Sequence, residues 1–250
     1  MSSRSSVVPI GADMAATGWL TSVRREIAKA LLICRKDLRI EWRNLDNLPA
    51  MFFFSLLVLV IFNFGFDFAT ADFRLLGPGV LWVAFSFSGV LAFGHSFTLE
   101  REGDCIQALM LAPVDAGTIY LGKLMANCVS ILIVESALLP LSAVLFNFDL
   151  LSVARPLGIV VLVHTIGFAA NGTLFGAMTA RTRRGDVLLP ILLFSVSVPL
   201  MISAVQTTTA AFAGKSIFEG SPGTWLVMAS VFDLVFITAA YLTFEYILEE

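Results

Sequence analysis

The stretch that decides the fold is residues 177–190, AMTARTRRGDVLLP, in which three arginines separate two long apolar runs. The runs cover about residues 157–180 and 187–206. Arginine is costly to place in lipid, so the three side chains must lie at an aqueous face of a membrane. Basic residues collect on the cytoplasmic face, so the triplet also predicts the orientation of the two runs.

The composition of the whole chain agrees with a membrane protein. Of 250 residues, 58% are hydrophobic and only 14% are charged, which is too apolar for a soluble domain with buried core helices. A membrane-spanning helix needs about 20 mostly apolar residues. The sequence predicts an all-α protein with six spans, at about 49–68, 77–97, 122–146, 157–180, 187–206 and 224–247.

The basic residues are distributed unequally between the two sides of these spans. Thirteen of the 16 Lys and Arg fall on the side of the N-terminus, and only Arg74, Arg155 and Lys215 fall on the other. This asymmetry predicts that both termini are cytoplasmic. An even number of spans also requires both termini on one side, so the two observations support each other.

The segment before the first span has the pattern of an amphipathic helix, at residues 19–47. Its apolar residues recur every three or four positions: Leu20, Val23, Ile27, Leu31, Cys34, Leu38, Trp42 and Leu45. Arginines and lysines occupy much of the remainder, which favours a helix lying in the membrane interface. The alternative is a solvated helix that packs on a soluble partner. We expect residues 1–18 to be a disordered cytoplasmic start and 48–250 to be the six-span domain.

The connection between the second and third spans is the best functional candidate. Charged residues stand at the mouth of the second span, three apolar residues then share one helical face, and a proline stops the helix. Such a helix can bury its apolar face in a groove on a cytoplasmic partner, or can lie on the membrane as a connector. The candidate docking residues are Glu100, Arg101, Glu102, Ile106, Leu109, Met110 and Pro113.

Four titratable residues inside the predicted spans are candidates for a functional role. Glu135 and Asp233 are ionisable groups at depth, which makes each a candidate for a transport pathway. The alternative is that each carboxyl is protonated or bonded to a polar side chain on a neighbouring helix. His95 and His164 have the side chain that commonly ligates haem iron. Their depths differ by about 17 Å at about 1.5 Å per residue, so we expect no stably bound haem between them, although transient contact with one histidine stays open.

The sequence contains no motif for nucleotide or metal binding. Gly214, Lys215 and Ser216 resemble the end of a phosphate loop, but Thr209 stands where that motif needs glycine. The three cysteines are scattered, without the spacing of a zinc site or a disulfide framework. If ATP drives this protein, a separate polypeptide must supply the ATPase. Nothing in the charge distribution suggests a nucleic-acid partner.

Several short runs together resemble the CcmB family. These runs are Gly77-Pro78-Gly79-Val80-Leu81-Trp82-Val83-Ala84-Phe85, Glu100-Arg101-Glu102, Leu109-Met110-Leu111-Ala112-Pro113-Val114, Ile119-Tyr120-Leu121-Gly122-Lys123-Leu124 and Arg183-Arg184-Gly185-Asp186-Val187-Leu188-Leu189-Pro190. The resemblance covers about residues 30–248. CcmB is the membrane subunit of the ABC-type haem exporter of cytochrome c maturation.

The resemblance implies a six-span permease of the ABC-2 exporter class in the bacterial inner membrane. Two copies would pair with two copies of a separate ATPase, CcmA, through a coupling helix at residues 103–112. CcmC, CcmD and the haem chaperone CcmE would be further partners. The ATP-driven step would be haem export or the release of haem-loaded CcmE. Two alternatives are an ABC-2 exporter of a lipid, polysaccharide or drug, and a membrane haem-binding or scaffold protein with no transport cycle.

Overall fold

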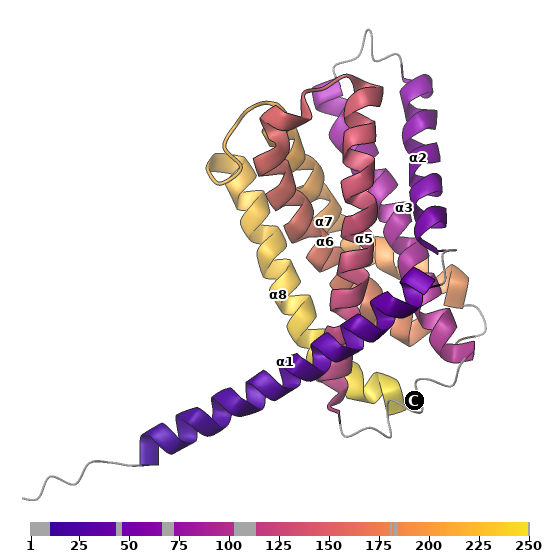
Figure 1. Cartoon of the computed structure of the whole chain (residues 1–250). Coiled ribbons are helices and arrows are strands. Elements are labelled where there is room, and N and C mark those ends of the chain that lie inside the picture. Colours follow the sequence, from indigo (N-terminus) through magenta and orange to yellow (C-terminus); the bar gives the residue numbers. More distant parts are fainter. Residues whose placement is uncertain are drawn as a thin grey trace, which may run out of the picture.

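The computed structural model describes residues 11–43, 47–66, 73–102, 114–180, 182 and 185–249. These residues form helices joined by short connections, without a strand in the part described (Figure 1). In chain order the helices are α1 (Gly11–Arg43), α2 (Asn47–Gly65), α3 (Phe73–Glu102), α5 (Ala116–Phe146), α6 (Leu150–Ala180), α7 (Gly185–Phe212) and α8 (Gly220–Glu249).

Six of these helices, α2, α3 and α5 to α8, are long and apolar enough to cross a membrane. The prediction of an all-α membrane protein with six spans is therefore confirmed. Several helices are longer than the predicted spans: α5 begins at Ala116 and α6 at Leu150. In α6 the helix passes through Pro156, because a helix in a bundle tolerates one missing backbone hydrogen bond when neighbouring groups compensate.

Helix α1 covers most of the predicted amphipathic segment but differs from it at both ends. It begins at Gly11, so residues 11–18 are helical where we expected disorder. This stretch contains Ala12, Ala15 and Ala16, and alanine has the highest helix propensity. Asn47 belongs to α2. Residues 1–10 lie outside the described part, and their expected disorder stays a prediction.

Helix α6 is the centre of the bundle and packs against α3, α5, α7 and α8. Small residues allow this close approach. A Cβ added to Gly172 would lie 2.0 Å from the ring of Phe93 on α3, and one added to Gly89 would lie 2.4 Å from the ring of Phe168. Without a hydrophobic driving force in lipid, helix association depends on such close packing.

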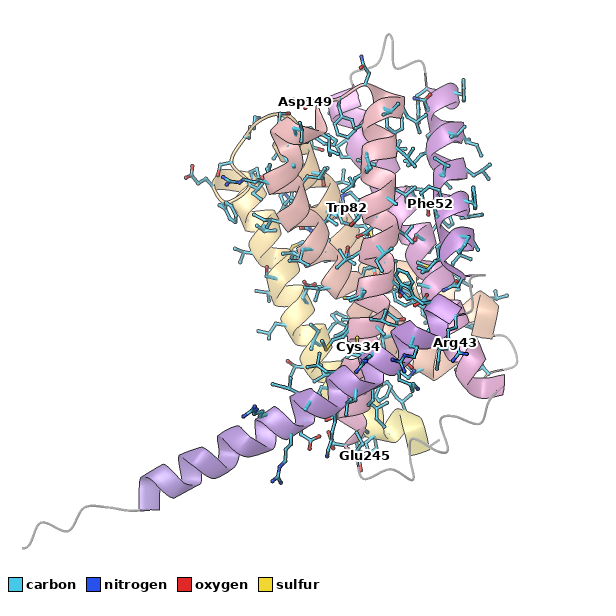
Figure 2. The ribbon with its side chains drawn as sticks, viewed as in Figure 1. Cys34, Arg43, Phe52, Trp82, Asp149 and Glu245 are labelled. Carbon is cyan, nitrogen blue, oxygen red and sulfur yellow. The ribbon has the colours of Figure 1, made fainter. Side chains whose placement is uncertain are left out.

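Helix α1 crosses obliquely the end of the bundle at which α8 ends, and its N-terminal half extends beyond the bundle (Figure 1). Its C-terminal half packs on α5. The contact depends on Gly122, because a Cβ there would lie 2.7 Å from Ile33 Cβ and 2.9 Å from the carbonyl oxygen of Ala30. Ala30, Ile33 and Cys34 are buried in this interface. Figure 2 shows Cys34 near the point where α1 meets the bundle.

Candidate functional site

Glu135 lies on α5 and is buried inside the bundle. Its carboxyl accepts a hydrogen bond of 2.8 Å from the hydroxyl of Thr165 on α6. This contact matches one alternative for the intramembrane carboxyls, a bond to a polar side chain on a neighbouring helix. A single neutral donor satisfies only part of the bonding capacity of a carboxylate, so the buried carboxyl remains costly at this position of α5.

Asp233 on α8 is buried against the backbone of α6. Its Oδ1 atom lies 1.8 Å from where a Cβ of Gly167 would stand, so only glycine leaves room for the carboxyl. Among the described residues this oxygen has no hydrogen-bond partner. An unpartnered carboxyl oxygen in an apolar interior is costly, which makes Asp233 a candidate for a functional role instead of simple packing.

His164 on α6 is fully buried, and both of its ring nitrogens face protein oxygens. Nδ1 lies 2.7 Å from the carbonyl oxygen of Val160, and Nε2 lies 2.9 Å from the hydroxyl of Ser203 on α7. The same hydroxyl donates to the carbonyl of Trp225 at 2.7 Å. The ring also packs on the indole of Trp82, with centroids 5.4 Å apart. Axial ligation of haem iron by His164 would therefore require breaking one of these contacts.

These three residues converge on one turn of α6, residues 164–167. Glu135 reaches this turn from α5, Asp233 reaches it from α8, and His164 leaves it toward α7. Three of the four titratable candidates inside the predicted spans thus share one level of the bundle. The fourth, His95, lies on α3, and its side chain is outside the described part. We refer to the turn at 164–167, with Glu135 and Asp233, as the polar centre.

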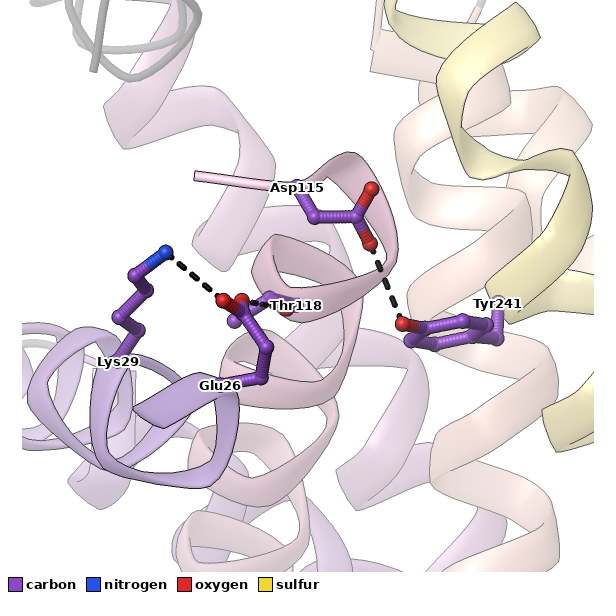
Figure 3. A network of polar contacts seen from close by, with 5 residues as sticks. All are labelled: Glu26, Lys29, Asp115, Thr118 and Tyr241. Atoms are coloured by element: carbon purple, nitrogen blue, oxygen red, sulfur yellow. Dashed lines mark hydrogen bonds and ion pairs between the residues drawn. The ribbon is translucent and has the colours of Figure 1, made fainter. Parts of the chain in front are cut away.

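A second group of polar contacts surrounds the first turn of α5 (Figure 3). Tyr241 on α8 donates a hydrogen bond of 3.2 Å to Asp115, the residue before α5. Thr118 in the first turn donates one of 2.9 Å to Glu26 on α1, which also pairs with Lys29 at 2.9 Å. The start of α5 is therefore tied to both α1 and α8. We refer to these five residues as the α5 junction.

Further along the same interface, two acidic residues of α1 meet polar residues of α5. The ammonium of Lys123 is buried and lies 3.6 Å from the carboxyl of Asp37. Glu41 accepts hydrogen bonds from the hydroxyl of Ser130 and, at 2.8 Å, from the amide of Asn47. Lys123 is one of the thirteen basic residues assigned to the side of the N-terminus, and it lies near the start of α5 beneath α1.

The environment of α1 changes the acidity of two of its side chains. Hydrogen bonds from Lys29 and Thr118 lower the pKa of Glu26 below its usual value. Burial against α5, with a smaller effect of Asp37, raises the pKa of the Cys34 thiol. Cys34 is therefore a packing residue with little thiolate character.

The predicted docking residues lie at the edge of the described part of the chain. Glu100, Arg101 and Glu102 are the last residues of α3, and nothing is described of their side chains. Ile106, Leu109, Met110 and Pro113 fall in residues 103–113, which lie outside the described part. Docking on a partner through these residues stays a prediction. The structure begins again at Val114, directly before the α5 junction.

Sequence reasoning missed the partners that complete both groups. Thr165 and Ser203 are single hydroxyl residues in apolar runs, and nothing in their spacing marks them. Gly167 could have been noted only as a small residue in a span. The α5 junction left a clearer trace in the sequence, because the acidic Glu26 stands among the basic residues of α1 and could have been noted as a candidate for a specific contact.

Six membrane-crossing helices with ionisable residues sequestered between them define a multi-pass helical membrane protein. Within that class the chain belongs to the CcmB family, because the family model described as "CcmB protein" matches residues 28–247. The matched region begins in the second half of α1 and includes all six spans.

Three relatives illustrate the similarity, and each is named heme exporter protein B. The Paracoccus denitrificans protein is 28% identical over 216 residues, which cover 85% of this chain and 94% of the relative. The Bradyrhizobium diazoefficiens protein is 24% identical over 205 residues, covering 81% and 90%. The Escherichia coli K12 protein is 29% identical over 184 residues, covering 72% and 81%.

Proposed function

We propose that this chain is the membrane subunit of an ABC-type haem exporter that serves cytochrome c maturation in the bacterial inner membrane. The observation that carries the proposal is the family match over residues 28–247, which takes in all six spans. Relatives named heme exporter protein B are covered over 81 to 94% of their length, so the likeness extends over nearly the whole of those proteins.

ATP hydrolysis in this proposal belongs to a separate chain, CcmA. The sequence supports this division because it has no complete phosphate-loop motif. Two copies of the chain pair with two copies of the ATPase, and both termini lie in the cytoplasm. The ATPase docks on the coupling helix expected at residues 103–112, in which the sequence pattern places the apolar residues Ile106, Leu109 and Met110 on one helical face.

The α5 junction is the route by which motion of the docking segment reaches the bundle. Asp115 and Thr118 follow that segment directly, and they are bonded to α8 and α1. A displacement at residue 114 therefore acts on three helices together, since coupling travels through contiguous bonded and packed groups. Helix α5 also carries Glu135, so the junction and the polar centre share one helix.

Two forms of the ATP-driven step are compatible with this arrangement. In the first, haem crosses the membrane with this subunit. In the second, ATP drives the release of haem-loaded CcmE from CcmC, and this subunit transmits the motion. Haem is a transported or transiently contacted ligand in both forms, and no cofactor is held permanently. The engaged nitrogens of His164 favour the second form, because they present no open axial ligand.

The test is complementation of a bacterium whose own heme exporter protein B has been deleted. Restored haem-stained c-type cytochromes, together with co-purification of CcmA, are the expected result. In the uncomplemented strain, accumulation of haem-loaded CcmE indicates the release step, whereas CcmE without haem indicates export. Association with an ATPase but no rescue of c-type cytochromes would contradict the proposal and point to another cargo.

A further inference from the structure

We propose that α1 binds the headgroups of anionic phospholipids through an arginine face made of Arg24, Arg25, Arg35, Arg39 and Arg43. All five arginines are exposed. This inference is independent of the proposed cargo, because it depends only on how α1 sits on the bundle and on the charges that it then presents.

One side of α1 is occupied by its contact with α5. Ala30 and Ile33 meet Gly122, and Glu26, Asp37 and Glu41 bond to residues of α5. At about 100° per residue these five positions fall within one sector of about 80°. Every acidic residue between positions 24 and 43 lies in this sector. The acidic charge of the helix is therefore turned toward the protein.

The arginine face lies on the opposite side. At the same rotation per residue, the five arginines are centred about 180° from Ala30. Lys29 and Lys36 occupy one flank, and each pairs with an acidic residue of α1, Glu26 and Asp37 respectively, at 2.9 Å. The packing of α1 on α5 thus separates its acidic residues, which face the protein, from its five arginines, which are exposed on the opposite side.

The other flank of α1 is apolar and free. Ile27, Leu31 and Trp42 are exposed there, between the contact with α5 and the arginine face, and Trp42 is 61% exposed. Leu32 is exposed on the arginine face itself. An apolar flank beside a basic face is the arrangement of a helix whose apolar side enters the acyl boundary while its charges stay at the headgroups. Figure 2 shows Arg43 at the end of α1 that lies on the bundle.

Anionic lipid fits this surface better than a protein partner does. The apolar flank needs a hydrocarbon phase, and the adjoining arginine face needs negative charge at the boundary of that phase. A guanidinium also forms paired hydrogen bonds with phosphate oxygens, which an ammonium cannot do. A phosphatidylglycerol surface supplies both the hydrocarbon and the net negative charge, whereas phosphatidylcholine supplies no net charge.

The proposal is tested with the purified full-length chain in neutral detergent, titrated with dansyl-labelled phosphatidylglycerol or phosphatidylcholine. Energy transfer from tryptophan to dansyl reports binding. We expect phosphatidylglycerol to bind more tightly and to lose affinity as salt increases. The triple variant Arg35→Gln/Arg39→Gln/Arg43→Gln should bind it on the order of 100-fold more weakly, since each basic residue contributes about fivefold.

A matched control changes exposed basic residues at the opposite end of the bundle, Arg155→Gln/Lys215→Gln, and should leave the affinity unchanged. Unaltered thermal stability of the triple variant shows that α1 still packs on α5. Equal affinity for the two lipids would overturn the proposal. So would a triple variant that binds phosphatidylglycerol normally but no longer co-purifies with the ATPase, because the arginine face would then be a protein-docking surface.

Discussion

The hydroxyl of Thr165 donates a hydrogen bond of 2.8 Å to the buried carboxyl of Glu135, which links α6 to α5 in the middle of the bundle. The carboxyl of Glu135 could serve either packing or transport, and the sequence does not distinguish these two roles. Packing needs only an oxygen that accepts this bond, whereas a role in transport needs a group that can ionise. The same turn of α6 also contacts Asp233 on α8. A change in the charge of Glu135 or of Asp233 should therefore act electrostatically on the other carboxyl.

Glu135→Gln isolates the ionisable proton. The amide carbonyl of Gln still accepts the bond from Thr165, so the bundle and its association with the ATPase should persist. We expect haem-stained c-type cytochromes to fall, because the residue lies at the costliest depth in the bilayer. Thr165→Val serves as the control, since it removes the bond but retains the carboxyl. Normal cytochrome levels in the Gln variant, at matched expression, would leave Glu135 a packing residue.

Asp37→Ala should destabilise the protein by about 3 kcal/mol, because it removes the carboxylate that lies 3.6 Å from the buried ammonium of Lys123. The double variant Asp37→Ala/Lys123→Met should recover most of this loss, since a well-packed apolar pair can replace a buried ion pair. Thermal unfolding in detergent measures both variants. If the single and double variants have the same melting temperature, the ion pair does not hold α1 on α5.

Leu109→Asp tests the predicted docking segment. The carboxylate would lie in the apolar face that is predicted to meet the ATPase, and loss of a buried anchor costs about 2 kcal/mol or more at an interface. We expect ATPase co-purification to fail while membrane insertion continues. Tyr241→Phe is the companion variant: it breaks the bond to Asp115 but leaves residues 103–113 unchanged.

The companion variant should retain the ATPase and lose part of the c-type cytochromes, because docking persists while transmission to α8 is weakened. If the ATPase still co-purifies in stoichiometric amount with the Leu109→Asp variant, docking occurs elsewhere. If the Tyr241→Phe variant has wild-type levels of c-type cytochromes, motion of the docking segment is not transmitted through α8.

Glu26 predicts a pH dependence at the α5 junction. Its pKa is lowered from the usual 4.5, so its bonds with Lys29 and Thr118 stabilise the folded chain above that value. The contribution is lost as pH falls through the lowered pKa. The wild-type protein should therefore have a higher melting temperature than the Glu26→Gln variant at neutral pH. This difference in melting temperature should vanish on acidification below the lowered pKa. A difference that stays constant over this titration would assign the effect of the substitution to packing instead of charge.

The orientation can be tested by labelling single cysteines in a variant without native cysteines. Cysteine at Leu151 or Ser221, both exposed at one end of the bundle, and at Ala71 should react with an impermeant thiol reagent from outside intact cells. Cysteine at Arg183 should react only after the membrane is permeabilised. This result follows from the arginine asymmetry, since basic residues are retained on the cytoplasmic side. Labelling of position 183 in intact cells would reverse the topology.

The sequence by itself determined the number of spans, their approximate positions and the presence of a helix before them. These properties are local, because about 20 apolar residues in lipid must satisfy their own backbone hydrogen bonds as a helix. The ends of the helices were not determined in this way: the predicted fourth span begins at about residue 157, whereas α6 begins at Leu150 and contains Pro156. The helical periodicity of α1 was equally local, although its alanine-rich start at Gly11 was not anticipated.

Only the tertiary structure decided which residues share a site. Nothing local indicated that Glu135, His164 and Asp233 meet one turn of α6, or which helix the acidic residues of α1 would pack against. In a membrane both the buried and the lipid-facing sides of a helix are apolar, so the hydrophobic pattern does not reveal how a span is rotated. The rotation is set by small residues such as Gly167 and Gly122, which act only through the neighbour that packs against them.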